Sequence, residues 1–349
     1  MSQKADEEVE KMINERKTFP KFSDNIYDQH RKRDLSNVTK ALYQTEPKIF
    51  YKLKEVQEKS LLAFCNLLLI TDEREQILDI IEEIVKLSPE QRSQFQDILH
   101  KTSLENIIET IGFIEERYKV IETLKTLIYD LTCFTNERDH IQKIIEQNYW
   151  IFGEKYNLAS ADKTMIKALE NYINILYGAK SPDVALTPDE ESNRRMDLFL
   201  CASRKTEDSF ETTIQENIVV ELKAPKVALS KTVLRQIEDY MDYIRKHSPF
   251  NGESRRWKFI AVCKEVDDDV KSRYETFKDR GKVGLVQVNN NYEIYALTWD
   301  DVFNAFEISH SFYLEKLKLN RDEIIKEISA KAENASRETV NEITNDILQ

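Results

Sequence analysis

Glycine is scarce in this chain, with only six residues in a length of 349. A phosphate-binding loop of the form Gly-x-x-x-x-Gly-Lys-Ser/Thr does not occur, and so few glycines also argue against a dinucleotide-binding Rossmann fold. The five histidines show neither HExxH nor HxH spacing, and there is no Gly-x-Ser-x-Gly motif. These absences argue against an ATPase, a Rossmann enzyme, a zinc hydrolase and a serine hydrolase.

Closely spaced cysteines and long apolar runs are also missing. The four cysteines are too far apart for a zinc knuckle or a CxxC redox pair, which favours a reduced, intracellular protein. The first residues lack the apolar core of a signal peptide. The most apolar run, residues 61–70, is too short to span a bilayer. We therefore expect a cytoplasmic protein without a membrane partner.

Positive charge is in deficit. Lysine and arginine total 51 against 63 aspartate and glutamate residues, so the formal net charge is −12. This charge argues against a broadly basic nucleic-acid-binding surface, so any contact with nucleic acid has to be local. The length exceeds the size at which a single core usually stops growing, which predicts more than one domain.

Two kinds of periodicity divide the chain. Up to about residue 135, apolar residues recur at helical spacing, and Ser88 with Gln91 forms a capping-box pattern before a helix at 89–100. Beyond Gly153, short β-branched or aromatic runs alternate with helical segments, as in an α/β domain. We predict strands at 195–200, 217–223, 257–263, 284–288 and 292–297. We predict helices at 136–150, 162–177, 230–247, 267–279 and 299–316.

These patterns predict three parts. Residues 1–135 form a helical N-terminal domain for regulation or oligomerisation, residues 136–318 form the α/β domain, and residues 319–349 form a polar tail that is helical or partly ordered.

A glutamate and a lysine end one apolar run, in the order Glu221-Leu222-Lys223. The period of a strand places Glu221 and Lys223 on one face, at the end of a buried segment. Similar tripeptides at 15–17, 46–48 and 269–271 show that the spacing alone also fits a solvated surface. The chemistry of phosphodiester hydrolysis, however, needs acidic ligands for a hard cation and a group that orients water.

Other polar side chains accompany this pair. Asp197 lies in an earlier apolar run, at a spacing that permits a hairpin with Glu221 beside it. Gln236 and Tyr240 lie one helical turn apart in the segment that follows, where they could contact substrate or brace the lysine, or simply pack. Glu146, in a helix ahead of the strands, is a candidate third acidic ligand or a surface charge.

Asp197, Glu221-x-Lys223 and Gln236-x-x-x-Tyr240 together resemble the PD-(D/E)xK nuclease superfamily, in particular its RecB-like branch. Residues 148–153, 220–225 and 297–301 further resemble the C-terminal domain of Shedu antiphage-defence proteins, and the resemblance covers about residues 137–316. Met196 stands where the superfamily motif has proline, although no metal ligand is lost by that change.

The resemblance implies a restriction-endonuclease-like core, with a mixed sheet flanked by helices, after an all-α N-terminal domain. It implies a bacterial defence nuclease that cuts double-stranded DNA, uses Mg²⁺ with Mn²⁺ as a substitute, and forms a homo-oligomer, a tetramer. Asp197 and Glu221, with Glu146 as a third candidate, would hold the ion, and Lys223 would place or activate water. Arg194 and Arg195 are candidate phosphate-binding residues or solubilising surface.

Three other interpretations stay open. The fold could recognise DNA or a partner without cutting, the helical half could make the protein a sensor, or the nuclease could be silent until an activator binds. A phage-derived trigger is compatible with the last of these, and the sequence does not identify it.

Overall fold

The computed structural model describes residues 2–45, 47–51, 53–70, 74–177, 186, 188, 193–205, 213–247, 250–317 and 321–348. The chain forms two compact units, residues 1–107 and 108–349. Within the described residues, no helix is long and apolar enough to cross a membrane.

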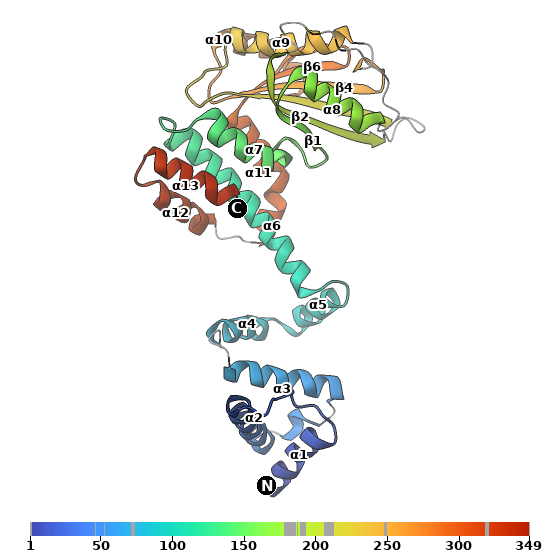
Figure 1. The fold of residues 1–349 in the computed structure, drawn as a ribbon, viewed down its shortest axis with the longest axis vertical. Helices are drawn as coiled ribbons and strands as arrows, with labels where there is room; N and C mark the ends of the chain where they lie inside the picture. The colour runs from blue at the N-terminus through green and yellow to red at the C-terminus, as the bar shows by residue number, and fades with distance from the viewer. Residues whose placement is uncertain are drawn as a thin grey trace. The chain divides into compact units, whose positions relative to one another are not determined.

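The described part of the first unit consists of helices (Figure 1). They are α1 (Ser2–Asn14), α2 (Ile26–Thr45), η1 (Pro47–Ile49), α3 (Glu55–Ile70), α4 (Arg74–Lys86), α5 (Pro89–Leu99) and the start of α6 (Leu104–Lys125). A small core forms where Met12, Phe50 and Leu62 meet. The predicted capping box is confirmed, because Ser88 accepts a hydrogen bond from the Gln91 amide and the Gln91 side chain accepts one from the Ser88 amide.

Large apolar side chains are exposed along α4, α5 and the first turns of α6. Ile80 is 59% exposed and Ile108 is 62% exposed, and no residue of α5 is buried. α4, α5 and the first turns of α6 therefore bury little of their apolar surface.

A mixed six-stranded sheet, counted over the described residues, forms the centre of the second unit in the order β1-β2-β3-β4-β6-β5. β3, β4 and β6 are parallel, whereas β1, β2 and β5 pair antiparallel to their neighbours. The strands are β1 (Asn157–Thr164), β2 (Arg195–Lys205), β3 (Thr213–Leu222), β4 (Arg255–Cys263), β5 (Leu285–Asn289) and β6 (Tyr292–Thr298). The predicted α/β class, a mixed sheet flanked by helices, is confirmed.

Helices cover both faces of this sheet (Figure 1). On one face α8 (Met165–Tyr177), α9 (Lys231–Lys246) and α10 (Asp268–Phe277) share a core with the strands. The helical elements that pack on the other face include α6, η2 (Thr126–Asp130), η3 (Glu137–Gln142), α7 (Lys143–Gln147), η4 (Tyr149–Phe152), α11 (Trp299–Leu317), α12 (Arg321–Ala332) and α13 (Arg337–Leu348).

The structure differs from the sequence-based description in four places. β1 is an additional strand, and α8 begins only after it, at Met165 rather than at residue 162. The segment expected as one helix at 136–150 is divided among η3, α7 and η4. The units separate at 107/108 rather than near 135, because the second half of α6 packs in the larger core. The segment expected as a polar tail, helical or partly ordered, is helical as α12 and α13, but it packs into the core, where Val340 and Ile343 are buried.

Candidate active site

Asp197 and Glu221 meet where β2 and β3 part. The antiparallel register of these strands ends at the pair Leu198–Val220, whereas β3 continues to pair with β4 as far as Leu222–Val262. One residue beyond the β2–β3 register, Asp197 Oδ2 accepts a hydrogen bond of 2.6 Å from the Leu222 amide. A side chain therefore takes the place of a main-chain partner for β3, and this brings the Asp197 carboxylate beside Glu221.

Glu221 is the centre of a hydrogen-bonded cluster. Lys223 Nζ donates to Glu221 Oε1, which also accepts from Gln236 Nε2 at 2.6 Å. The Tyr240 hydroxyl lies 3.1 Å from Glu221 Oε2, and Lys223 Nζ lies 3.3 Å from Gln236 Oε1. The structure thus brings together Asp197, Glu221, Lys223, Gln236 and Tyr240, the residues that the sequence pattern singled out.

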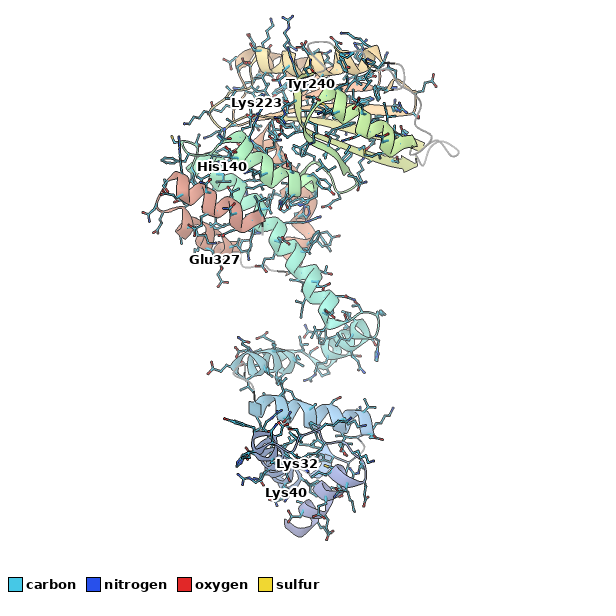
Figure 2. The ribbon with its side chains drawn as sticks, viewed as in Figure 1. Lys32, Lys40, His140, Lys223, Tyr240 and Glu327 are labelled. Atoms are coloured by element: carbon cyan, nitrogen blue, oxygen red, sulfur yellow. The ribbon has the colours of Figure 1, made fainter. Side chains whose placement is uncertain are left out.

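Gln236 and Tyr240 reach the cluster because α9 is amphipathic. Leu234, Ile237, Met241 and Ile244 bury one side of the helix against the sheet. The hydroxyl of Tyr240, whose ring lies in this core, is 2.8 Å from Gln236 Nε2 and 2.8 Å from the Arg195 carbonyl oxygen. Tyr240 therefore links α9 to the start of β2 as well as to Glu221, and Figure 2 labels its side chain together with Lys223.

Burial dominates the electrostatics of the two acids. Asp197 is only 6% exposed and Glu221 only 4%. Burial, added to the charge of Glu221, raises the pKa of Asp197 to about 8 despite the hydrogen bond from the Leu222 amide. Burial also raises the pKa of Glu221, although Lys223 and Tyr240 oppose that shift.

Lys223 stays cationic. Burial alone would lower the pKa of Lys223, but Glu221, Glu137 and Asp197 surround it with negative charge and raise the pKa above its usual value. An ammonium group that is held between carboxylates is a fixed positive charge at neutral pH.

Glu137 is a third acidic side chain at the site, and no motif of the sequence predicted it there. Its Oε2 accepts a hydrogen bond of 2.7 Å from the Ala224 amide, and its charge acts on Asp197, Glu221 and Lys223. Glu146, the residue selected from sequence, lies one helical segment later, where it accepts from Gln142 Nε2 at 3.0 Å. Burial raises the pKa of Glu146, and the charges that act on it are those of Asp162 and Lys143.

The arginine pair at the start of β2 is engaged with aspartates. Arg194 Nη1 lies 2.8 Å from Asp239 Oδ2, and Arg195 Nε lies 3.2 Å from Asp162 Oδ1. A phosphate bound at either guanidinium would compete with a carboxylate that is already present.

Two further lysines lie beyond the ends of the central parallel strands. Lys264 directly follows β4 and its Nζ lies 3.2 Å from Thr132 Oγ1, while Lys226 Nζ donates to the Cys133 carbonyl at 3.1 Å. Parallel strands bring their carboxyl ends to one edge of a sheet. The position of Lys264 directly after a predicted strand therefore already indicated that this lysine lies at that edge.

The donor set suits a hard divalent cation. Asp197, Glu221 and Glu137 supply carboxylate oxygens, which Mg²⁺ and Mn²⁺ prefer. When all are ionised, three carboxylates and one ammonium leave an excess of two negative charges, which a divalent ion would neutralise. In the described part of the chain, no group of three or more His, Cys, Asp and Glu side chains is already arranged as a metal-binding cluster. The residues fit such an ion in chemistry and charge.

Comparison of the chain with protein-family models, with curated proteins and with solved structures found no match.

Proposed function

We propose that this protein is a metal-dependent nuclease of the PD-(D/E)xK class, with Mg²⁺ or Mn²⁺ as its cofactor and double-stranded DNA as its substrate. The observation that supports the proposal best is the meeting of Asp197, Glu221 and Lys223 with Gln236 and Tyr240 at one point of a mixed sheet. Burying two carboxylates beside a fixed cation costs folding free energy. Such groups are found mostly where they bind a ligand or take part in a reaction.

Within that class, the proposal places the chain with Shedu antiphage-defence proteins, as a homo-oligomeric, cytoplasmic enzyme of bacteria. It rests on the resemblance of residues 148–153, 220–225 and 297–301 to the nuclease domain of that family. Exposed apolar side chains on α4 and α5, among them Ile80 and Ile98, support assembly through the N-terminal unit.

Each residue of the cluster has a distinct role in the proposed reaction. Asp197, Glu221 and Glu137 would hold the cation. When bound, Mg²⁺ would polarise the phosphodiester and lower the pKa of a water molecule. Lys223, which stays protonated, orients the attacking water and neutralises charge that develops on the phosphate. Gln236 holds Lys223 and Glu221 in place from α9, and Tyr240 secures Glu221 against β2.

A second candidate is a silent state of the same enzyme, which an activator opens. Glu221 Oε1 already accepts hydrogen bonds from Lys223 and Gln236, and Asp197 accepts one from the Leu222 amide. The Tyr240 hydroxyl, which has one proton for Glu221 Oε2 or the Arg195 carbonyl oxygen, lies 3.1 Å from Oε2. Binding a cation at Glu221 would displace part of this network, so a conformational change at the site would control activity.

The decisive experiment incubates the purified protein with linear and supercoiled DNA in Mg²⁺ or in EDTA, alongside Glu221→Gln and Lys223→Ala. We expect metal-dependent cleavage that falls by a factor of about 10³ or more in each variant. Glu216→Gln is the matched control, because Glu216 is a buried carboxylate on the same strand that pairs with Lys155 on the opposite face. Equal cleavage by Glu221→Gln and Glu216→Gln would overturn the proposal.

A further inference from the structure

An open groove of about 940 Å³ borders the candidate active site. On one side it is lined by η3 and the residues before it, and on the other by α13. It reaches the site at Glu137, whose carboxylate acts on Asp197, Glu221 and Lys223, and at Ala224, which directly follows Lys223. Six of its lining residues are Cys133, Arg138, Lys143, Ala224, Arg337 and Asn341.

The side of α13 that lines the groove carries no carboxylate. Residues Arg337, Asn341, Thr344 and Asn345 share one side of the helix, by their spacing of three and four positions, and all of them line the groove. The acidic residues of the same helix, Glu338, Glu342 and Asp346, fall on another side and do not line it. The groove as a whole is lined by three cations, Arg138, Lys143 and Arg337, against two carboxylates, Glu137 and Asp139. In a chain with a net charge of −12, it therefore carries a local excess of positive charge.

The cations of the groove are available to a ligand. Arg138, Lys143 and Arg337 are exposed, and within the described residues their side chains form no ion pair or hydrogen bond. This differs from Arg194 and Arg195, which are paired with Asp239 and Asp162.

A hydrogen bond joins the two walls. The Asn136 amide donates to His140 Nδ1 at 2.8 Å, so the proton of this imidazole lies on Nε2, which donates to Asn341 Oδ1 at 3.0 Å. His140, labelled in Figure 2, is buried and holds α13 at a fixed distance from η3. Because the carbonyl of Asn341 is engaged, its amide nitrogen is left to donate hydrogen bonds to an anionic ligand.

We propose that this groove holds the phosphodiester strand of a DNA duplex beside the cleavage site, with α13 as one of its walls. The inference rests on the proposed nuclease function and deepens it by assigning the substrate path. Three unpaired cations and a row of amides suit a chain of phosphates, which such side chains contact without reading sequence. The groove reaches Glu137 and Ala224, which directly follows Lys223, so a strand in it would present the next phosphate to the site.

Cys133 offers a direct test, because it is a free, exposed thiol that lines the groove. The full-length protein is alkylated with N-ethylmaleimide in EDTA, with and without a short DNA duplex, and each cysteine is followed by mass spectrometry. At a duplex concentration of about ten times the dissociation constant, we expect alkylation of Cys133 to slow about tenfold. Cys201, which is partly buried in β2, is the internal control and should be unaffected.

Charge reversal gives a second measurement. Arg337→Glu should weaken duplex binding roughly tenfold and reduce the slope of log affinity against log salt by about 1. Lys326→Glu, an exposed lysine on the adjacent α12 that does not line the groove, should change neither. Fluorescence anisotropy in EDTA measures both variants without cleavage.

The outcomes separate this inference from the proposed function. If the protein cuts DNA in Mg²⁺ but Cys133 stays reactive under bound duplex, or if Arg337→Glu binds as Lys326→Glu does, the groove is not the substrate path although the nuclease stands. If duplex protects Cys133 and no DNA is cut, the groove binds the strand, and a nuclease that is active without an activator is ruled out. Equal protection by inorganic phosphate, or no binding of duplex at all, overturns the groove as a strand-binding site.

Discussion

The carboxyl group of Asp197 is charged only when something compensates for its burial. Its pKa lies near 8 because burial and the negative charge of Glu221 both oppose ionisation, and the Leu222 amide only partly offsets them. A cation that binds at Asp197 therefore has to displace a proton at neutral pH.

We accordingly expect cation affinity to depend on pH. Below about pH 8, the apparent affinity for Mg²⁺ or Mn²⁺ should rise by up to about tenfold per pH unit and then level off, because one proton leaves Asp197 on binding. Isothermal titration calorimetry with Mn²⁺ between pH 6 and 9 measures this slope. The slope should be lost in Asp197→Asn, and the same slope in both proteins would contradict the assignment.

The same shift predicts an effect on stability without metal. A carboxyl group whose pKa is raised on folding favours the protonated folded state, so its contribution falls as pH rises from the unfolded value near 4 to about 8. Asp197→Asn keeps an acceptor for the Leu222 amide and removes the charge. In EDTA at pH 9 its thermal midpoint should exceed that of the wild type by several degrees, and the difference should nearly vanish at pH 5. If Asp197→Asn were less stable than the wild type at pH 9, the raised pKa of Asp197 would be contradicted.

At the scale of elements, the strands were predictable because they are rich in β-branched and aromatic residues. β3, with its run Ile218, Val219 and Val220, and β4 were found within a few residues of their observed ends. β1 was missed because its sequence, Asn-Leu-Ala-Ser-Ala-Asp-Lys-Thr, is mostly polar or small. It forms an edge strand with a bulge between Leu158 and Ser160, so pairing with β2 rather than local preference fixes it.

The sequence could not show which glutamate of residues 136–150 lies at the site. Glu137 and Glu146 both lie in the stretch that the sequence assigned to one helix, and no local pattern distinguishes their roles. The structure separates them because Glu137 is placed against Ala224, which comes much later in the chain. Only tertiary contact could reveal that difference.

Glu137→Gln and Glu146→Gln form a matched pair that tests this assignment. Glutamine at 137 can still accept from the Ala224 amide, so the change mainly removes a charge beside Asp197 and Glu221. We expect Glu137→Gln to weaken Mn²⁺ binding by on the order of tenfold, or about 1.4 kcal/mol, and Glu146→Gln to change it little. Calorimetry under identical conditions measures both affinities. A larger loss of Mn²⁺ affinity in Glu146→Gln would show that Glu146, the residue predicted from sequence, is the third acidic ligand.

At the scale of the molecule, α6 belongs to both units. Its first turns are exposed, whereas Tyr118, Ile121 and Leu124 are buried with the strands and α11 in the core of the second unit. The change of periodicity near residue 135 therefore marks a change of element type and not the limit of a core.

Two fragments test that boundary. Residues 108–349 should unfold cooperatively, whereas residues 136–349 should not fold, because they lose Tyr118, Ile121, Leu124 and Ile128 from the core. Each such side chain contributes about 1.5–3 kcal/mol on burial, and the sum is comparable with the total stability of a domain. Circular dichroism melts of both fragments measure the difference. A cooperative melt of residues 136–349 at an unchanged midpoint would mean that α6 is dispensable.

The core that joins α6 to α13 also affects how fast the second unit folds. One hydrophobic cluster connects Tyr118 with Ile343, and the central strands β3, β4 and β6 pair in parallel across long intervening segments. Contacts between residues so distant in the chain form slowly, because loop closure costs entropy before any burial compensates for it. During synthesis the groove lacks a wall until α13 has left the ribosome. The strand-binding surface is therefore among the last features of the second unit to mature.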